Sequence, residues 1–253
     1  MRGDAGTALV TGAAGGIGSA YARALAARGH QTIVSDLPGP ALDAVAAQVG
    51  ARAVPADLSR QDGVDRLAAE AAGVSFLMLA AGFGTHALFH EADLAQQRAM
   101  VAVHVDATVA LARAALPGMV SRGSGSLVSV ASAGAYMRFP RDATYIGTKA
   151  FLVAWAECLA IELRGTGVAV QALCPAWVRT GFASRGDYAA AGYRSPIPGW
   201  LFTSPEVIVA ASLRALGRGT VCVPTLRGRL AVAAIGSPPG RLALQAARDR
   251  RRP

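Results

Sequence analysis

The feature that most constrains the fold is a regular alternation of short, strand-like apolar runs with longer stretches of helical periodicity. Strand-like runs are expected at residues 7–11, 31–35, 51–55, 74–80, 126–131, 167–173 and 219–223. Helices are expected between them, at residues 16–29, 40–49, 61–72, 92–116, 143–164 and 204–216. Strands separated by helices pair in parallel through right-handed crossovers. The sequence therefore predicts an α/β fold with a doubly wound, seven-stranded parallel sheet flanked by helices.

A high apolar content agrees with this architecture. The hydrophobic fraction of 53% suits a parallel sheet, which is buried on both faces. No Pro/Ser/Gly-rich linker or internal repeat divides the chain, so a single domain over 1–253 is expected. No transmembrane segment is expected, because Glu157 and Glu162 interrupt the best candidate, 151–163. The chain has three cysteines, Cys158, Cys174 and Cys222, and their spacing is not that of a metal or redox motif. We therefore expect no metal site, and a reducing cytoplasm is the favoured location.

The net charge of +9 is concentrated near the C-terminus. Residues 227–253 contain seven Arg and one Asp, so this basic tail carries six of the nine net positive charges. The tail can contact a polyanion or a membrane surface, but a solvated, frayed end is the expected state. The rest of the chain is close to balanced. This distribution argues against a nucleic-acid-binding protein.

The turn after the first expected strand is a candidate phosphate cradle. It runs from Thr11 through a cluster of glycines into a helix. Glycines let the backbone turn tightly and approach a pyrophosphate, and the helix start offers free N–H groups. The residues that would hold the phosphates are Gly12, Gly15, Gly16, Ile17 and Gly18. The strand–turn–helix context predicts a Rossmann-type dinucleotide site.

The second expected strand ends at Asp36, about 20 residues after this turn. A carboxylate there can accept hydrogen bonds from both hydroxyls of an adenosine ribose and would repel a 2′-phosphate. Leu37 and Pro38 follow, and no Arg stands beside Asp36. Alternatively, Asp36 caps the next helix. The pattern favours NAD as the cofactor over NADP.

Lys149 is the only lysine of the chain, among 24 arginines. It follows Tyr145 by four residues in an expected helix, so the two side chains share one helix face. An ammonium on a flexible stem can lie beside a phenol and a ribose, a role that a rigid guanidinium fills poorly. By spacing alone, Lys149 can equally be a surface residue. The pair is a candidate proton-transfer site that depends on its context.

Together, the glycine run, the Tyr145-x-x-x-Lys149 pair and the strand–helix alternation resemble the short-chain dehydrogenase/reductase family over essentially the whole chain. Ser132 precedes Tyr145 by 13 residues, the family's usual separation for its catalytic serine. The same resemblance implies an adenine contact at Asp57 and Leu58. It also assigns the turn after the fourth strand and the nicotinamide-holding segment to Ala81, Gly82, Pro175, Val178 and Thr180.

The resemblance implies a dehydrogenase or ketone reductase. Hydride transfer to a ketone leaves an alkoxide, and Tyr145 would protonate it or accept the proton in the reverse direction. A phenol titrates near pH 10, so the charge of Lys149 would favour the phenolate, and its ammonium would also hold the nicotinamide ribose. Ser132 would hydrogen-bond the substrate oxygen.

Four positions depart from the family pattern. His104 replaces an Asn on the long helix after strand four, and Leu79 and Ala80 replace two more Asn. Ala176 replaces a Gly. In the family, the main-chain carbonyl of the helix Asn positions a water that joins the lysine to solvent. His104 can keep that backbone role, add a titrating group to the proton path as a fourth catalytic residue, or be a packed histidine with local hydrogen bonds.

A mostly apolar alcohol or ketone is the expected substrate. Its pocket should lie between Ser132, Tyr145, residues 135–139 and a lid at about 181–202. The segment that includes this lid is rich in aromatic residues: Trp177, Phe182, Tyr188, Tyr193, Trp200 and Phe202. Each arginine near the pocket is expected to be solvated, although one of them can bind a carboxylate or phosphate group of the substrate. These arginines are Arg138, Arg141, Arg179, Arg185 and Arg194.

The helices expected at 92–116 and 143–164 are too apolar for a wholly solvated outer face. In the family these helices form subunit interfaces, so the resemblance implies a homodimer or homotetramer. The sequence therefore predicts an NAD-dependent oxidoreductase that interconverts a secondary alcohol and a ketone. The alternative is a dinucleotide-binding protein of the same fold that catalyses elimination or isomerisation, or that acts as a sensor or scaffold.

Overall fold

Seven parallel strands form the centre of the structure, in the order β3-β2-β1-β4-β5-β6-β7. The computed structural model describes residues 5–181 and 198–236. The strands are β1 (Thr7–Thr11), β2 (Gln31–Ser35), β3 (Arg52–Ala53), β4 (Phe76–Leu79), β5 (Gly125–Val130), β6 (Val168–Leu173) and β7 (Val221–Cys222). Every neighbouring pair is parallel, which confirms the predicted doubly wound sheet. The strand order reverses between β1 and β4, where ligands bind in such sheets.

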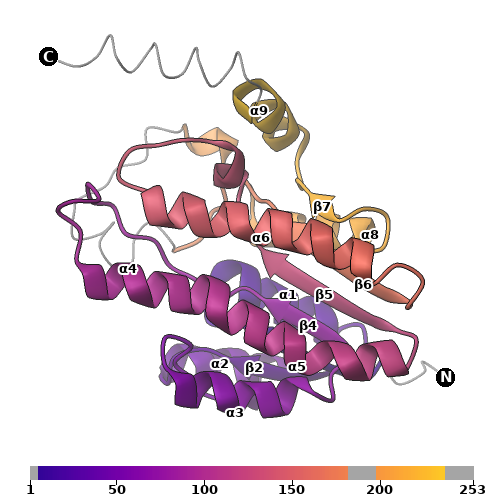
Figure 1. The fold of residues 1–253 in the computed structure, drawn as a ribbon. Helices are drawn as coiled ribbons and strands as arrows, with labels where there is room; N and C mark the ends of the chain where they lie inside the picture. Colours follow the sequence, from indigo (N-terminus) through magenta and orange to yellow (C-terminus); the bar gives the residue numbers. More distant parts are fainter. Residues whose placement is uncertain (1–4, 182–197, 237–253) are drawn as a thin grey trace, which may run out of the picture.

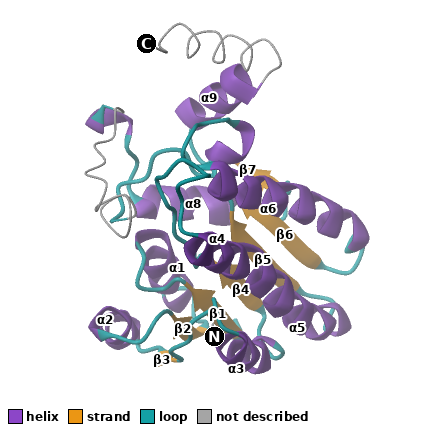
Figure 2. Cartoon of the chain, turned by 60° about the vertical axis from the view of Figure 1, so that its left-hand side comes forward, coloured by secondary structure: helices purple, strands orange, loops and turns teal. Residues whose placement is uncertain are grey.

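Helices cover both faces of the sheet (Figures 1 and 2). One face is packed by α3, α5 and α6, and the other by α1, α2 and α8. The helical segments are α1 (Gly16–Ala26), α2 (Pro40–Val49), α3 (Gln61–Ala71), α4 (Leu94–Val101), η1 (Ala102–Asp106), α5 (Ala107–Ser121), η2 (Ala133–Tyr136), α6 (Ala143–Glu162), η3 (Gly199–Leu201), α8 (Pro205–Ala215) and α9 (Leu226–Gly236). The central strands are therefore buried on both sides, as their continuous apolar sequences require.

A buried polar network joins helices to the sheet on the α1 side. The hydroxyl groups of Tyr21 in α1 and Ser212 in α8 are hydrogen-bonded, and Ser212 donates to the Oε1 atom of Gln171 in β6. The Nε2 group of Gln171 returns a hydrogen bond to the Ser212 carbonyl at 3.2 Å. Each polar side chain of the network thus has a partner, so its burial carries no unpaired group. The network fixes α8 against α1 directly behind the glycine-rich turn.

The predicted helix at 92–116 differs from the structure. It is divided into α4, a π-helical turn at η1 and α5, which continues to Ser121. The π turn contains His104, whose side chain is held on both sides as described below. Strands β3 and β7 are shorter than predicted. The beginning of the predicted basic tail forms helix α9, whereas residues 237–253 lie outside the described part of the chain.

Two helical stretches are long and apolar enough to cross a membrane by length and composition, Leu94–Ser121 and Ala143–Glu162. Both pack on the sheet in this structure and supply core residues, among them Leu111 and Met119 from α5 and Leu152 from α6. Core helices of α/β domains pass the same test. The two stretches therefore carry no separate argument for a membrane span.

Candidate active site

The glycine-rich turn between β1 and α1 is folded so tightly that side chains are excluded from it. Gly12 has a φ of +64°, and a Cβ atom there would lie 2.6 Å from the backbone of Ala80. A Cβ atom on Gly18 would overlap the carbonyl oxygen of Gly12. The turn also leads into the N-terminus of α1, whose first N–H groups are free to bind an anion. This cradle fits the pyrophosphate of a dinucleotide.

The segment after β6 meets this cradle. A Cβ atom on Gly16 would lie 2.6 Å from Cγ2 of Thr180, so the two predicted cofactor-binding regions are in contact. Val178 forms an isolated parallel bridge with Thr203, and the Thr203 N–H donates to the Trp177 carbonyl at 2.9 Å. These bonds hold the segment that contains Pro175, Val178 and Thr180 at the carboxyl edge of the sheet.

Asp36 lies at the end of β2 and holds the glycine turn from the side. Its Oδ2 atom accepts the N–H of Ala14 at 2.9 Å, and Oδ1 accepts the N–H of Leu37 at 2.8 Å. Helix α2 begins at Pro40 with Gly39 as its N-cap, so Asp36 does not cap it and that alternative is wrong. A carboxylate has about four acceptor positions, which leaves two for a ribose.

Asp57 stabilises the turn before α3 through one oxygen. Its Oδ1 atom accepts hydrogen bonds from the N–H and the hydroxyl of Ser59, at 2.9 and 2.7 Å. Leu58 beside it is buried in the core. Ala81 lies after β4, and its N–H and that of Ala80 both donate to the Thr11 hydroxyl, at 3.2 and 3.1 Å. Thr11, which the sequence did not single out, therefore satisfies the backbone where the family has Asn.

The side chains of Ser132 and Tyr145 are hydrogen-bonded to each other, and both residues are partly exposed. Ser132 precedes η2, and the N–H of Gly134 donates to its Oγ atom at 3.0 Å, which fixes the side chain. Burial raises the pKa of Tyr145 to about 12, whereas the hydrogen bond with Ser132 lowers it and the charge of Asp142 raises it. Tyr145 is therefore protonated at neutral pH in this structure.

Lys149 lies below this pair and is only 5% exposed. Its Nζ group donates to the Val130 carbonyl at 2.8 Å and lies 5.6 Å from the centre of the Tyr145 ring. Burial lowers the pKa of Lys149 to about 7. The structure thus places the amine beside the phenol, as the spacing predicted. Burial, rather than the charge of Lys149, dominates the pKa of Tyr145.

His104 connects three elements around the same site. Its Nε2 atom accepts the N–H of Phe83 at 3.1 Å, and its Nδ1 atom lies 2.8 Å from the Thr148 hydroxyl. Since Thr148 donates its one proton to the Tyr145 carbonyl at 2.8 Å, it accepts from His104, which must carry the proton on Nδ1. A Cβ atom on Gly82 would lie 2.7 Å from Nε2, so Gly82 makes room for the ring.

The protonation state of His104 follows from these contacts. The ring is 1% exposed, and burial, followed by the charge of Lys149, holds its pKa well below the usual range. Nε2 accepts a hydrogen bond from the Phe83 N–H, which requires the neutral form, while Nδ1 carries the proton that is donated to Thr148. His104 therefore lies at the site as a bridge between the turn after β4 and α6. Neither Thr148 nor Phe83 was singled out from the sequence, because their partners are 44 and 21 residues away.

The remaining histidines have separate places. His86 lies half-buried beside the site, with Nδ1 3.9 Å from the carboxylate of Asp142. His30 is hydrogen-bonded to the Gly6 carbonyl at 3.2 Å in the turn that enters β2. His90 is exposed. Within the described residues, no group of three His, Cys, Asp or Glu side chains forms a metal site.

Several predicted pocket residues lie outside the described part of the chain, and so does most of the predicted lid: Phe182, Arg185, Tyr188, Tyr193 and Arg194. Arg138 donates to the carbonyls of Ala135 and Met137, at 3.1 and 2.7 Å, so it braces the backbone beside the site. Arg141 has a positive φ of +72°, a strained conformation immediately before Asp142 and the start of α6.

Comparison with known proteins identifies the family of the chain. The family model described as short chain dehydrogenase matches residues 6–188. The chain is 37% identical over 188 residues to a galactitol 2-dehydrogenase (L-tagatose-forming) from Cereibacter sphaeroides, covering 71% of this chain and 74% of that protein. It is 28% identical over 222 residues to a very-long-chain 3-oxoacyl-CoA reductase from Bos taurus, covering 83% and 68%.

A solved structure agrees. A short-chain dehydrogenase from Sphingobium yanoikuyae in complex with NADPH superposes with a TM-score of 0.79 and 29% identity, covering 96% of this chain and 93% of that one. The chain belongs to the short-chain dehydrogenase family, and it is an oxidoreductase of that family. Its cradle fits a dinucleotide cofactor.

Proposed function

We propose that this protein interconverts a secondary alcohol and a ketone with NAD, on a mostly apolar substrate. The observation that carries the proposal is the hydrogen bond between the Ser132 and Tyr145 side chains, two partly exposed residues, with the Lys149 amine beside the tyrosine ring. A carbonyl or alkoxide oxygen that replaced the bond between the two hydroxyls would receive one hydrogen bond from each of them. A protein that only binds a dinucleotide has no need of such a pair.

Tyr145 is the proposed acid and base. When bound, the cofactor supplies the hydride to the carbonyl carbon or takes it from the alcohol. Because burial keeps the Tyr145 hydroxyl protonated at neutral pH, it is ready to protonate a developing alkoxide in the reductive direction. Alcohol oxidation requires the phenolate, so its rate should rise with pH toward the tyrosine pKa.

Lys149 and Ser132 are proposed to support this proton transfer. The Lys149 ammonium has three donors, and one is used on the Val130 carbonyl, which leaves two for the nicotinamide ribose and its surroundings. Ser132 is held by the Gly134 N–H, so its own proton can point at the substrate oxygen. His104 is proposed as a positioning residue rather than a member of the proton path, because its ring must stay neutral.

The preference for NAD is proposed from Asp36. Its carboxylate lies beside the glycine turn, where a 2′-phosphate would meet a negative charge. The related Sphingobium yanoikuyae protein was solved with NADPH, so the cofactor must be tested directly. Asp36→Ala should weaken NADH binding and should reduce or invert the preference for NADH over NADPH. A wild-type protein that prefers NADPH would contradict the role of Asp36 while leaving the dehydrogenase proposal intact.

An apolar substrate is supported by the surroundings of the hydroxyl pair. Met137 at the end of η2 is buried, and the aromatic residues Trp177 and Phe202 between β6 and α8 are partly exposed. A homodimer or homotetramer is proposed from the exposed apolar residues on α4, α5 and α6, which include Val101, Val109 and Ile161. A cytoplasmic location is proposed because all three cysteines are free thiols.

The decisive test is hydride exchange by the purified protein. NADH oxidation should be visible in the nicotinamide absorbance with at least one member of a panel of apolar ketones, and Tyr145→Phe should abolish it. Titration with NADH, followed by fluorescence, should show nearly unchanged binding in that variant. Binding of NADH by the wild type without exchange on any ketone or alcohol would favour the sensor or scaffold alternative. Turnover without net oxidation or reduction would favour elimination or isomerisation.

A further inference from the structure

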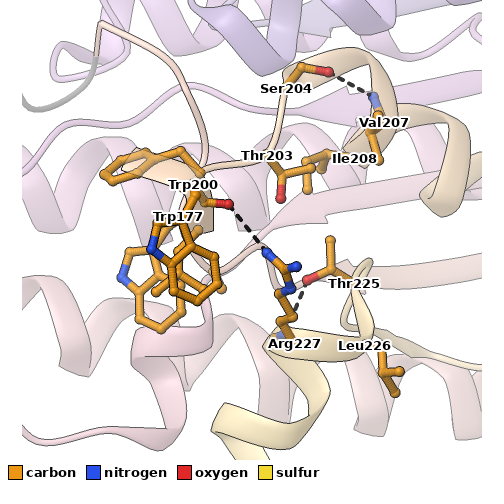
Figure 3. Close-up of a pocket in the computed structure, with 13 residues that line it drawn as sticks. Trp177, Trp200, Thr203, Ser204, Val207, Ile208, Thr225, Leu226 and Arg227 are labelled. Carbon is orange, nitrogen blue, oxygen red and sulfur yellow. Dashed lines mark hydrogen bonds between the residues drawn. The ribbon is translucent and has the colours of Figure 1, made fainter. Parts of the chain in front are cut away.

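A hollow of about 510 Å³ lies between the segment after β6 and the N-terminal ends of α8 and α9. Its walls come from the segment after β6, from η3, and from the first turns of α8 and α9 (Figure 3). This volume is within the range of small-molecule sites. The residues that decide its chemistry are Trp177, Trp200, Phe202, Ile208, Thr225 and Arg227.

The lining combines aromatic walls with one cation. Trp177 and Trp200 both line the hollow, and Figure 3 shows the Arg227 side chain reaching from α9 toward Trp200. The Nη1 group of Arg227 donates to the Trp200 carbonyl at 3.3 Å, and Cζ lies 5.0 Å from the centre of the Trp200 ring. The guanidinium is therefore held in place and still has donors to offer.

The charge of Arg227 is not balanced locally. The lining contains no Asp or Glu, and among the described residues no carboxylate lies within ion-pair distance of Arg227. The hydroxyl groups of Thr203, Ser204 and Thr225 add donors around the hollow. An apolar space with a single fixed guanidinium is complementary to an apolar body that carries one anionic group.

The hollow is connected to the reacting site through one short segment. Ala176 lines the hollow, and the carbonyl of the preceding Pro175 accepts the N–H of Ala133, next to Ser132, at 2.9 Å. Helix α9 also packs against η2, which begins after Ser132. A ligand in the hollow therefore lies against the same backbone that positions the catalytic serine.

We propose that this hollow binds the distal end of the substrate, an apolar chain or ring system that ends in a carboxylate, with Arg227 as the carboxylate ligand and Trp200 as its stacking wall. This inference rests on the proposed function for the reacting end of the substrate. Binding of the carboxylate end by Arg227 does not depend on that proposed function. The Arg-rich segment near the C-terminus thereby gains a specificity role that its charge alone did not indicate.

Binding is tested first without turnover, using decanoate and 1-decanol as probes and tryptophan fluorescence as the readout. Decanoate should bind more tightly than 1-decanol. Arg227→Gln should weaken the binding of decanoate about tenfold and leave the affinity for 1-decanol unchanged. Arg229→Gln is the matched control, because Arg229 lies on the same helix and donates to the Val223 carbonyl outside the hollow. Trp200→Phe should reduce the fluorescence response, and what remains should come from Trp177, which also lines the hollow.

Equal weakening by Arg227→Gln and Arg229→Gln would overturn the proposal, since the effect would then be net charge alone. Equal affinity for decanoate and 1-decanol in the wild type would also overturn it.

Activity provides the second readout. Methyl ketones of increasing length that end in a carboxylate should show a lower KM than their methyl esters, and Arg227→Gln should erase this difference with little change in kcat. Exchange with ketones but no preference for the acid would overturn the role of Arg227 and leave the proposed function standing. Arg227-dependent binding of decanoate without any hydride exchange would do the reverse.

Discussion

The glycine cradle and the proposed proton-transfer site lie at the same edge of the sheet, yet they are built in opposite ways. The cradle is made of backbone: Gly12 and Gly18 leave no space for a Cβ atom, and Asp36 pins the turn through the Ala14 N–H. The proton-transfer site is made of side chains from separate elements, with Lys149 and His104 almost fully buried. A backbone site tolerates no added volume, whereas a side-chain site is sensitive to charge and pH.

The largest expected effect tests the side-chain site. Tyr145→Phe removes the proton donor without changing the shape of α6, so turnover should fall by about 10²–10⁴-fold, the usual contribution of a general acid. Steady-state kinetics beside NADH titration would measure both properties. If dinucleotide affinity fell together with turnover, the two regions would not be separable as described.

Gly18→Ala makes the corresponding test of the cradle. The new methyl group would overlap the Gly12 carbonyl, so the free energy of unfolding should fall by about 1–3 kcal/mol and dinucleotide binding should weaken. Gly147→Ala is the matched control, because it lies in α6 between Tyr145 and Lys149 with nothing within 4 Å of the added Cβ. It should be neutral or stabilise by up to ~1 kcal/mol. Chemical denaturation would measure both, and an unaffected Gly18→Ala protein would show that the turn is not tightly closed.

Burial of the Lys149 amine lowers the free energy of unfolding by an amount that depends on pH. The pKa of Lys149 is lowered by folding, so its burial destabilises the fold fully below about pH 7, and this penalty decreases as pH rises toward the unfolded value. Lys149→Met should therefore raise the thermal stability of the cofactor-free protein more at pH 6 than at pH 9. The two gains should differ by on the order of 2–3 kcal/mol. An equal gain at both pH values would show that the ammonium is stabilised in place.

His104 gives a smaller effect of the same sign, at lower pH. Its folded pKa is depressed, so below about pH 6.5 the unfolded chain takes up a proton that the folded chain does not. The free energy of unfolding therefore decreases as the pH is lowered. In His104→Asn, whose amide can both donate and accept, this loss should be smaller by about 2 kcal/mol at pH 5. Thermal melts from pH 7 to pH 5 would show the difference. Identical pH profiles for the two proteins would mean that His104 is protonated in the fold, and would return it to the proton path.

The same contrast explains what could be predicted. The parallel sheet and the cradle follow from local patterns, because strand and helix periods, glycine positions and strand ends are all read within about 40 residues. The π turn at η1 was not predicted, since one extra residue per turn leaves the apolar periodicity of 92–116 almost unchanged. Helix α9 was assigned to a solvated tail because the charge was counted over all of 227–253, although α9 itself contains two of the seven Arg residues of that segment.

The sequence by itself determined the strand–helix alternation, the glycine turn, Asp36 at the end of β2 and the spacing from Tyr145 to Lys149. Each of these depends on short-range geometry that the residue types impose. Tertiary structure alone decided that Lys149 is buried against Val130, that His104 bridges Phe83 and Thr148, and that Arg227 meets Trp200. Burial and long-range hydrogen bonds set the charge states of these groups, and no local pattern encodes which distant residues will supply them.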